Sequence, residues 1–213
     1  MTVTAHTHAR ARAHTHTHTH THTLTHTHTH THTSHPCLDE LDFNKLTFIC
    51  VVGQGTFGDC YKGFYRENEL CAIKKMRLSL LDTAGAEAFA REVKILSSIS
   101  HVNLVTFVGF VVDPAVLIVM EFVGGGTLSD WIKSLREKNK VPSAAQCLGI
   151  LLDVASGMHY LHTRKPSAIM HRDLKADNVL LTTDEEMRGK IADLGEASFE
   201  ERESELGMCG TQG

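Results

Sequence analysis

The first apolar part of this 213-residue chain is interrupted by a glycine-rich segment, Gly53-Gln54-Gly55-Thr56-Phe57-Gly58. Residues 46–52 form a short apolar run before it, and a second strand-like run, residues 60–65, follows at once. A polar turn then leads into a third run, residues 70–76. This order is typical of an antiparallel meander. The glycines therefore lie between two strands, and not between a strand and a helix as in a dinucleotide-binding fold. An ordinary hairpin turn is the alternative for this segment taken alone.

The segments that follow the meander predict one helix and two more strands. Asp82-Thr83 is a plausible helix cap, and apolar side chains follow it at three- and four-residue spacing. These side chains are Phe89, Val93 and Leu96. Two further apolar runs, residues 104–112 and 116–122, predict strands. Residues 43–122 therefore hold five strands and one helix.

The pattern becomes helical beyond Gly124-Gly125-Gly126. Residues 128–137 predict one helix and residues 143–162 a longer one. The longer helix is apolar over much of its circumference, which predicts burial on most sides. Its apolar residues near one face are Ile150, Leu151, Val154, Met158 and Leu161. The fold class is therefore α+β, with a β-rich small lobe joined by a glycine-rich link to the beginning of a helical lobe.

Residues 1–36 form a low-complexity tail of mostly Thr, His, Ala and Arg, and hold 12 of the 16 histidines. His and Thr alternate over residues 14–33, with one interruption at Leu24. Neither face of such a strand would be apolar, so nothing offsets the entropy lost on ordering, and the tail is predicted to be disordered. Metal binding by the histidines is the alternative. A repeated CA dinucleotide in the gene, read as the codons CAC and ACA, would also encode alternating His and Thr, so the tail is interpreted as a translated microsatellite.

Charge and cysteine content exclude several classes of protein. The formal net charge of -4 gives no reason to expect a nucleic-acid or membrane surface. The six cysteines are scattered, without C-x-x-C spacing, and are expected to be reduced thiols. They are Cys37, Cys50, Cys60, Cys71, Cys147 and Cys209. The N-terminus lacks an apolar signal run, so a soluble cytoplasmic chain is expected.

The most specific motif is His171-Arg172-Asp173-Leu174-Lys175-Ala176-Asp177-Asn178. It resembles the catalytic loop H-R-D-L-K-x-x-N of eukaryotic protein kinases at every defined position. Further along, Asp193-Leu194-Gly195 corresponds to the D-F-G of that family, with Leu in place of Phe. The resemblance implies a bilobal kinase fold and an enzyme that transfers the ATP γ-phosphate to a protein hydroxyl.

The resemblance also implies roles for four polar residues. Asp173 would accept or orient the proton of the substrate hydroxyl, and Lys175 would steady the γ-phosphate. Asn178 and Asp193 would supply hard oxygen ligands to Mg²⁺, which bridges the phosphates. A surface polar group is the alternative for each residue alone, and the ordered set argues against it.

Cys71-Ala72-Ile73-Lys74 resembles the V-A-I-K of the same family. Strand alternation puts Ala72 and Lys74 on one face, with Lys74 directed toward the α- and β-phosphates and Lys75 toward solvent. A buried lysine without a partner would lose its charge, and Glu92 in the predicted helix supplies a carboxylate. A solvated helix carboxylate is the alternative for Glu92.

The adenine subsite follows from the same resemblance. Met120-Glu121-Phe122-Val123 falls at the hinge, with Met120 as gatekeeper, and Cys60 and Leu180 would sandwich the ring with Ala72. The glycine segment would cover the phosphates, with Phe57 shielding them from water. Cys60 is either an electrophile-reactive thiol or, as favoured here, a buried one. The implied ATP-binding set is Val52, Gly53, Gln54, Gly55, Thr56, Phe57, Gly58, Cys60, Ala72, Lys74, Glu92, Met120, Glu121, Val123 and Leu180.

Lys175 and Gly210-Thr211 resemble serine/threonine kinases, and the small-lobe sequence is most similar to the tyrosine-kinase-like group. Arg172 beside Asp173 implies control by a phosphate on the activation segment, with Ser198 or Ser204 as the acceptor. The protein substrate, the activator and the oligomeric state stay open.

The resemblance covers residues 43–213, roughly two-thirds of a kinase domain, divided into a small lobe at 43–122 and a partial large lobe at 123–213. The A-P-E motif and the large central helix are missing from the sequence given, so the 143–162 helix is expected to lack a packing partner. We therefore expect poor solubility and little activity from this chain. A catalytically inactive ATP-binding regulatory fragment is the alternative function.

Overall fold

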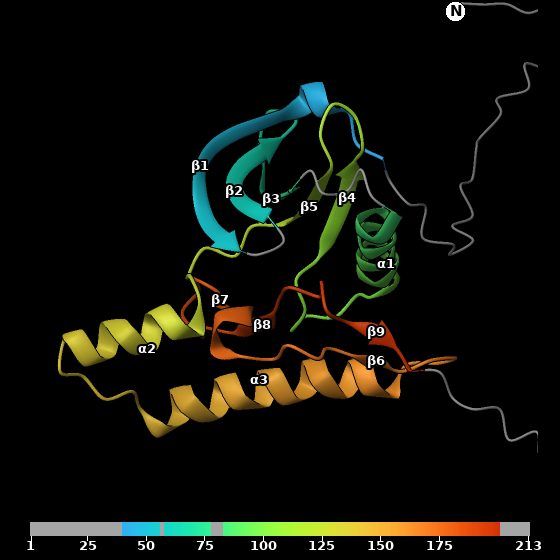
Figure 1. Cartoon of the computed structure of the whole chain (residues 1–213). Coiled ribbons are helices and arrows are strands. Elements are labelled where there is room, and N and C mark those ends of the chain that lie inside the picture. Colours follow the sequence, from blue (N-terminus) through green and yellow to red (C-terminus); the bar gives the residue numbers. More distant parts are fainter. Residues whose placement is uncertain (1–39, 56–57, 78–82, 201–213) are drawn as a thin grey trace, which may run out of the picture. The chain divides into compact units, whose positions relative to one another are not determined.

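The computed structural model describes residues 40–55, 58–77 and 83–200, so the histidine–threonine tail lies outside the described part. Five antiparallel strands form one sheet in the order β1-β2-β3-β5-β4 (Figure 1). The strands are β1 Leu46–Gly55, β2 Gly58–Tyr65, β3 Glu69–Met76, β4 Phe107–Val111 and β5 Leu117–Glu121. The meander predicted from the apolar runs is β1, β2 and β3.

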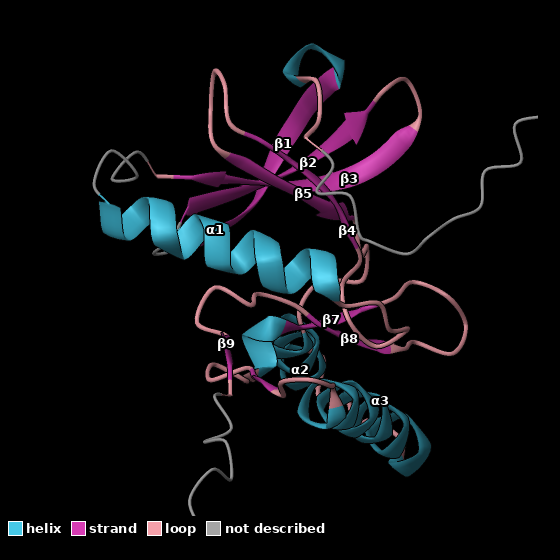
Figure 2. Cartoon of the chain, turned by 90° about the vertical axis from the view of Figure 1, so that its right-hand side faces the viewer, coloured by secondary structure: helices cyan, strands magenta, loops and turns pink. Residues whose placement is uncertain are grey.

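One helix, α1 (Thr83–Ser98), lies alongside this sheet (Figure 2). Its apolar residues at three- and four-residue spacing, Val93 and Leu96, are buried in the core. The ring of Phe89 packs edge-on against Phe110 of β4, with the ring centroids 6.0 Å apart. The predicted cap at Asp82 lies outside the described residues. A short 3-10 turn, η1 (Phe43–Lys45), precedes β1.

The large lobe begins with two helices whose starts are fixed by capping boxes. In α2 (Leu128–Glu137), Thr127 and Asp130 cap one another, and in α3 (Ala144–Thr163), Ser143 and Gln146 do the same. Such reciprocal caps satisfy backbone N–H groups that a helix start leaves free. The remaining elements are β6 Ile169–Met170, η3 Ala176–Asn178, β7 Val179–Leu181, β8 Gly189–Ile191 and β9 Ser198–Phe199, with β6 paired to β9 and β7 to β8.

The strand predicted for residues 104–112 is shorter in the structure, where β4 begins at Phe107 and the first two residues of the run bond to the other lobe. Leu104 forms a parallel bridge to Ile191 of β8, and the Val105 N–H donates to the Ile191 carbonyl oxygen at 2.9 Å. Gly157 of α3 allows this approach, since a Cβ there would lie 3.0 Å from the Asn103 carbonyl oxygen. The apolar run was therefore read correctly as buried, but part of it is buried against β8.

The apolar circumference of α3 is only partly covered by the described residues. Ile150 and Leu161 are buried, whereas Leu151 is 65% exposed, and Leu148 and Leu152 are also exposed. The expected lack of a packing partner therefore applies to one side of the helix. No helix in the described part combines the length and the apolar character needed to span a membrane.

Candidate active site

Three segments that are far apart in the sequence meet at the ammonium group of Lys74. Lys74 Nζ donates to Glu92 Oε1 of α1 at 2.7 Å and to Asp193 Oδ1, just after β8, at 3.0 Å. The Lys74 side chain is 12% exposed and that of Glu92 is 4% exposed. Lys75 is exposed, because neighbouring residues of a strand point to opposite faces. Lys74 therefore faces the space between the lobes, and Glu92 is its buried partner.

The carboxylates of Glu92 and Asp193 stabilise the positive charge of Lys74, and Lys74 stabilises the negative charge of Glu92. Burial alone would lower the pKa of the Lys74 ammonium, but the carboxylates of Glu92 and Asp193 outweigh it, and the pKa is raised. Burial raises the pKa of Glu92, against the opposing effect of Lys74. Lys74 thus stays an ammonium ion throughout the physiological range. Such a fixed cation is suited to bind an anionic group between the lobes.

The segment from His171 to Asn178 forms a second cluster around Asp173. Lys175 Nζ donates to Asp173 Oδ2 at 2.7 Å, and Asn178 Nδ2 donates to the same oxygen at 3.0 Å and to the Asp173 backbone carbonyl oxygen at 2.8 Å. The hydrogen bond from Lys175, with a smaller one from Asn178, lowers the pKa of Asp173, although partial burial opposes this. Asp173 is therefore a carboxylate at neutral pH, ready to accept a hydrogen bond from a hydroxyl group.

His171 connects this loop to the strand that precedes Asp193. The Asp173 N–H donates to His171 Nδ1 at 3.3 Å, so Nδ1 acts as an acceptor. His171 Nε2 then carries the ring proton and donates it to the Ala192 carbonyl oxygen at 3.1 Å. The Ala192 N–H donates to the Asn178 carbonyl oxygen at 2.9 Å. These bonds place Asn178 and Asp193 on adjoining backbone.

Two residues of this region have a left-handed backbone, which is uncommon outside glycine. They are Arg172, with φ of 65°, and Asp193, with φ of 57°. Such conformations persist where surrounding contacts fix them, and they concentrate at functional sites. At Asp193 the side chain is held by Lys74 and the preceding residue by His171 and Asn178.

The glycine-rich segment lies between the paired strands β1 and β2, as predicted. Gly53 pairs with Cys60, Gln54 with Asp59 and Gly55 with Gly58. A Cβ atom at Gly58 would overlap the carbonyl oxygen of Lys75, so only glycine fits there. Thr56 and Phe57, the predicted tip of the loop, lie outside the described residues.

Strand register places most of the predicted adenine subsite on one face. Cys60 lies opposite Lys74, and Ala72 lies opposite Met120 of β5. Burial raises the pKa of the Cys60 thiol, more than Lys74 lowers it, which favours a buried unreactive thiol at this position. Val52 is half exposed on β1. Leu180 bridges to Thr127 on the other side, at the end of the hinge.

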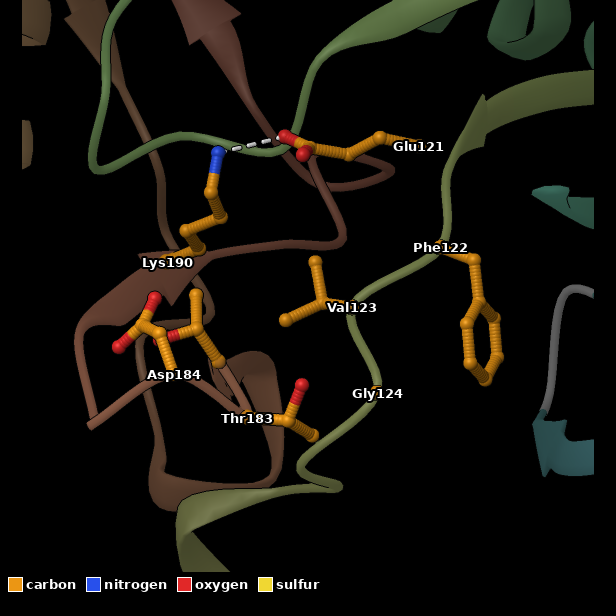
Figure 3. Close-up of a pocket in the computed structure, with 8 residues that line it drawn as sticks. Glu121, Phe122, Val123, Gly124, Thr183, Asp184 and Lys190 are labelled. Atoms are coloured by element: carbon orange, nitrogen blue, oxygen red, sulfur yellow. Dashed lines mark hydrogen bonds and ion pairs between the residues drawn. The ribbon is translucent and has the colours of Figure 1, made fainter. Parts of the chain in front are cut away.

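Glu121 takes part in contacts that the sequence did not predict. Its Oε1 atom accepts from Lys190 Nζ of β8 at 2.7 Å, and from the backbone N–H and hydroxyl of Thr106 at 2.7 and 2.8 Å. Glu121 and Lys190, together with Val123 and Asp184, border a pocket of about 320 Å³ behind the hinge (Figure 3). The hinge is thus tied to β8, three residues before Asp193.

The carboxylate of Glu121 should make stability depend on pH. Burial favours its neutral form, but hydrogen bonds from Lys190 and Thr106 outweigh this and lower its pKa from the ordinary 4.5. A lowered pKa gives stability that is present above pH 4.5 and lost as the pH falls through the folded-state value. We expect Glu121→Gln to lose about 1–2 kcal/mol of unfolding free energy at pH 7, since the contact is partly exposed.

Urea unfolding of both proteins at a series of pH values measures this effect. The gap between wild type and Glu121→Gln should close below pH 4.5, because the glutamine still accepts from Thr106 but carries no charge in either state. A gap that does not change with pH would show that charge attraction to Lys190 contributes nothing.

The two candidate phosphate acceptors differ in what the structure describes. Ser198 lies in β9, opposite Met170 of β6, and its hydroxyl oxygen is buried with no hydrogen-bond partner among the described residues. An acceptor hydroxyl has to reach the phosphorylating enzyme, so Ser198 would first have to leave β6. Ser204 and Gly210-Thr211 lie outside the described residues.

Comparison with known proteins agrees with this geometry. The family model "Protein kinase domain" matches residues 46–213. The chain is 35% identical over 163 residues to Chitin elicitor receptor kinase 1 of Physcomitrium patens, which covers 76% of this chain and 24% of that protein. It is 39% identical over 147 residues to Calmodulin-binding receptor-like cytoplasmic kinase 2 of Arabidopsis thaliana, covering 68% of this chain and 35% of that protein.

A third relative, Serine/threonine-protein kinase STY46 of Arabidopsis thaliana, is 36% identical over 159 residues, covering 74% of this chain and 26% of that protein. The chain thus spans about a quarter to a third of the length of these relatives. The five-stranded sheet with α1, and the helices that begin a second lobe, are the corresponding part of a kinase fold. The chain belongs to the protein kinase domain family, and its curated relatives include serine/threonine kinases.

Proposed function

We propose that this chain binds Mg·ATP between its two lobes and directs the γ-phosphate to a serine or threonine hydroxyl of a protein. The observation that carries the proposal is the ammonium of Lys74 held by carboxylates from both lobes, Glu92 and Asp193. An ATP-binding cleft needs a fixed cation next to a metal-binding carboxylate, since the charge of the triphosphate must be neutralised. The chain supplies both at one point.

The residues present fit a magnesium ion. Asn178 donates through its amide nitrogen to Asp173, which leaves its side-chain carbonyl oxygen for a metal. Asp193 adds a carboxylate on the adjoining backbone. Oxygen ligands of this kind suit Mg²⁺, which when bound would neutralise the charge of the phosphates. We assign the metal to Asn178 and Asp193.

The remaining predicted residues divide between binding and transfer. The β1–β2 hairpin covers the phosphates, and the hinge at Met120–Val123 holds adenine beneath Cys60 and Ala72. Asp173 orients the substrate hydroxyl and accepts its proton, because its lowered pKa keeps it ionised. Lys175, bonded to Asp173, balances the charge of the transferred phosphate.

Titration of the purified chain with ATP, with and without Mg²⁺, tests the proposal. We expect Mg²⁺ to raise ATP affinity by about 5–150-fold, the usual range of coupling between two ligands. Asp193→Ala should remove this gain while adenosine affinity is unchanged. Glu196→Ala, an exposed carboxylate in the same segment, is the matched control.

Two results would decide against parts of the proposal. If neither ATP nor adenosine binds the wild-type chain, the nucleotide site is wrong. If nucleotide binds as expected but no phosphate reaches a protein substrate, the chain is an ATP-binding regulatory fragment instead.

A further inference from the structure

Lys62 of β2 lies on the face of the sheet that looks toward the cleft. In the β2–β3 ladder, Cys60 lies opposite Lys74 and Lys62 lies opposite Ala72. Residues directly opposite one another project from the same face, and so do residues two apart on one strand. Lys74 reaches Asp193 of the other lobe, so this face is the roof of the cleft. Lys62 is therefore a second cation on that roof, and neither motif nor resemblance assigned it a role.

The ring of Phe122, the hinge residue that directly follows β5, is the contact of this lysine. Lys62 Nζ lies 4.9 Å from the ring centroid, within the distance of about 6 Å at which a cation and an aromatic face attract. Figure 3 shows the ring on the opposite side of the hinge backbone from Lys190 and Asp184, so it does not point into the pocket behind the hinge. In the described part of the chain, no carboxylate forms an ion pair with Lys62.

We propose that Lys62 and Phe122 are positioning residues that hold the roof strand β2 to the hinge and so set the height of the adenine subsite. The inference rests on the proposed function, because it concerns the same nucleotide cleft. β2 is bonded to the hinge strand β5 only through β3, so the contact of Lys62 with Phe122 is a direct link between β2 and the hinge. This cation–aromatic contact limits how far β2 can move away from the hinge.

This positioning role predicts that loss of the contact lowers nucleotide affinity. A ligand that needs the closed roof binds with an apparent affinity reduced by the fraction of molecules that have it. Removing the contact destabilises the closed roof by at most the free energy of that contact, and the closed fraction falls accordingly. We therefore expect adenosine affinity to fall about two- to fivefold in Lys62→Met and in Phe122→Leu, which is the range of a partly exposed cation–aromatic pair.

Calorimetric titration of adenosine and of Mg·ATP into the whole chain provides the test. If the two residues act through each other, the double variant Lys62→Met/Phe122→Leu binds no more weakly than either single variant. Lys62→Arg should retain wild-type affinity, since a guanidinium also attracts an aromatic face. Lys75→Met, on the exposed face of β3, is the matched control and should bind as wild type does.

Each contrary result has a distinct meaning. Wild-type binding by both single variants would overturn the inference and leave the proposed function intact. A loss in Lys62→Met that is larger for Mg·ATP than for adenosine, with no effect of Phe122→Leu, would overturn it too, because Lys62 would then contact phosphate directly. If the wild-type chain binds neither ligand, the proposed function fails first, and the inference fails with it.

Discussion

Lys74→Met is expected to lower the free energy of unfolding by about 3–5 kcal/mol at neutral pH, the usual effect of removing one partner from a buried ion pair. Methionine fills similar space, so the loss is electrostatic. The Glu92 carboxylate is 4% exposed and loses the ammonium at 2.7 Å. Domains have a total stability of about 5–15 kcal/mol, so this single change would remove a large share of it. Denaturant unfolding of the two proteins measures the difference.

A double variant separates this explanation from simple loss of packing. Lys74→Met/Glu92→Gln carries no buried charge at the pair, so it should be more stable than Lys74→Met alone. Lys75→Met removes an exposed ammonium from the same strand and should leave stability nearly unchanged. If the double variant were no more stable than Lys74→Met, the unpaired carboxylate would not be the cause.

The pH dependence of Lys74→Met has a definite sign. Burial already raises the pKa of Glu92, and without Lys74 nothing opposes it strongly. A group whose folded pKa is raised adds stability below its unfolded value, here about 4.5, and loses it as the pH rises. The deficit of Lys74→Met against wild type should therefore be small near pH 4.5 and grow toward neutral pH.

Sequence patterns predicted a helix or strand well where neighbouring residues alone determine it. The predicted helices at residues 128–137 and 143–162 are α2 and α3, whose starts carry the local capping boxes Thr127–Asp130 and Ser143–Gln146. The run at 104–112 was misjudged in length, because an apolar residue shows that it is buried but not against which partner. Leu104 is buried against β8 of the other lobe rather than in the five-stranded sheet.

The site residues also divide into those that a local pattern predicted and those that it did not. The likeness to V-A-I-K together with period-two alternation was enough to choose Lys74 over Lys75, and the predicted helix supplied Glu92 as its partner. The contacts of Glu121 with Lys190 and of Lys62 with Phe122 depend on how the hinge passes between the lobes. No short-range pattern encodes that path, so both pairs became visible only in three dimensions.

Asp173→Asn is expected to lower phosphate transfer by about 10²–10⁴-fold, the usual contribution of a positioned general base. Asparagine keeps the shape and can still accept from Asn178, but it cannot take a proton from the substrate hydroxyl. Affinity for Mg·ATP should stay unchanged, because the proposed ligands of the nucleotide are Lys74, Asn178 and Asp193. Transfer of labelled phosphate to a generic protein substrate, or to the chain itself, measures the effect.

The matched control for this variant is Asp177→Asn, which removes an exposed carboxylate from the same loop. A slow wild-type rate is sufficient, because the readout is the ratio of two rates and not the rate itself. If Asp177→Asn lowered the rate as much as Asp173→Asn, the loop would need its net charge rather than one base. If Asp173→Asn kept the wild-type rate, Asp173 would not be the base, and its bonds to Lys175 and Asn178 would serve only to hold the loop.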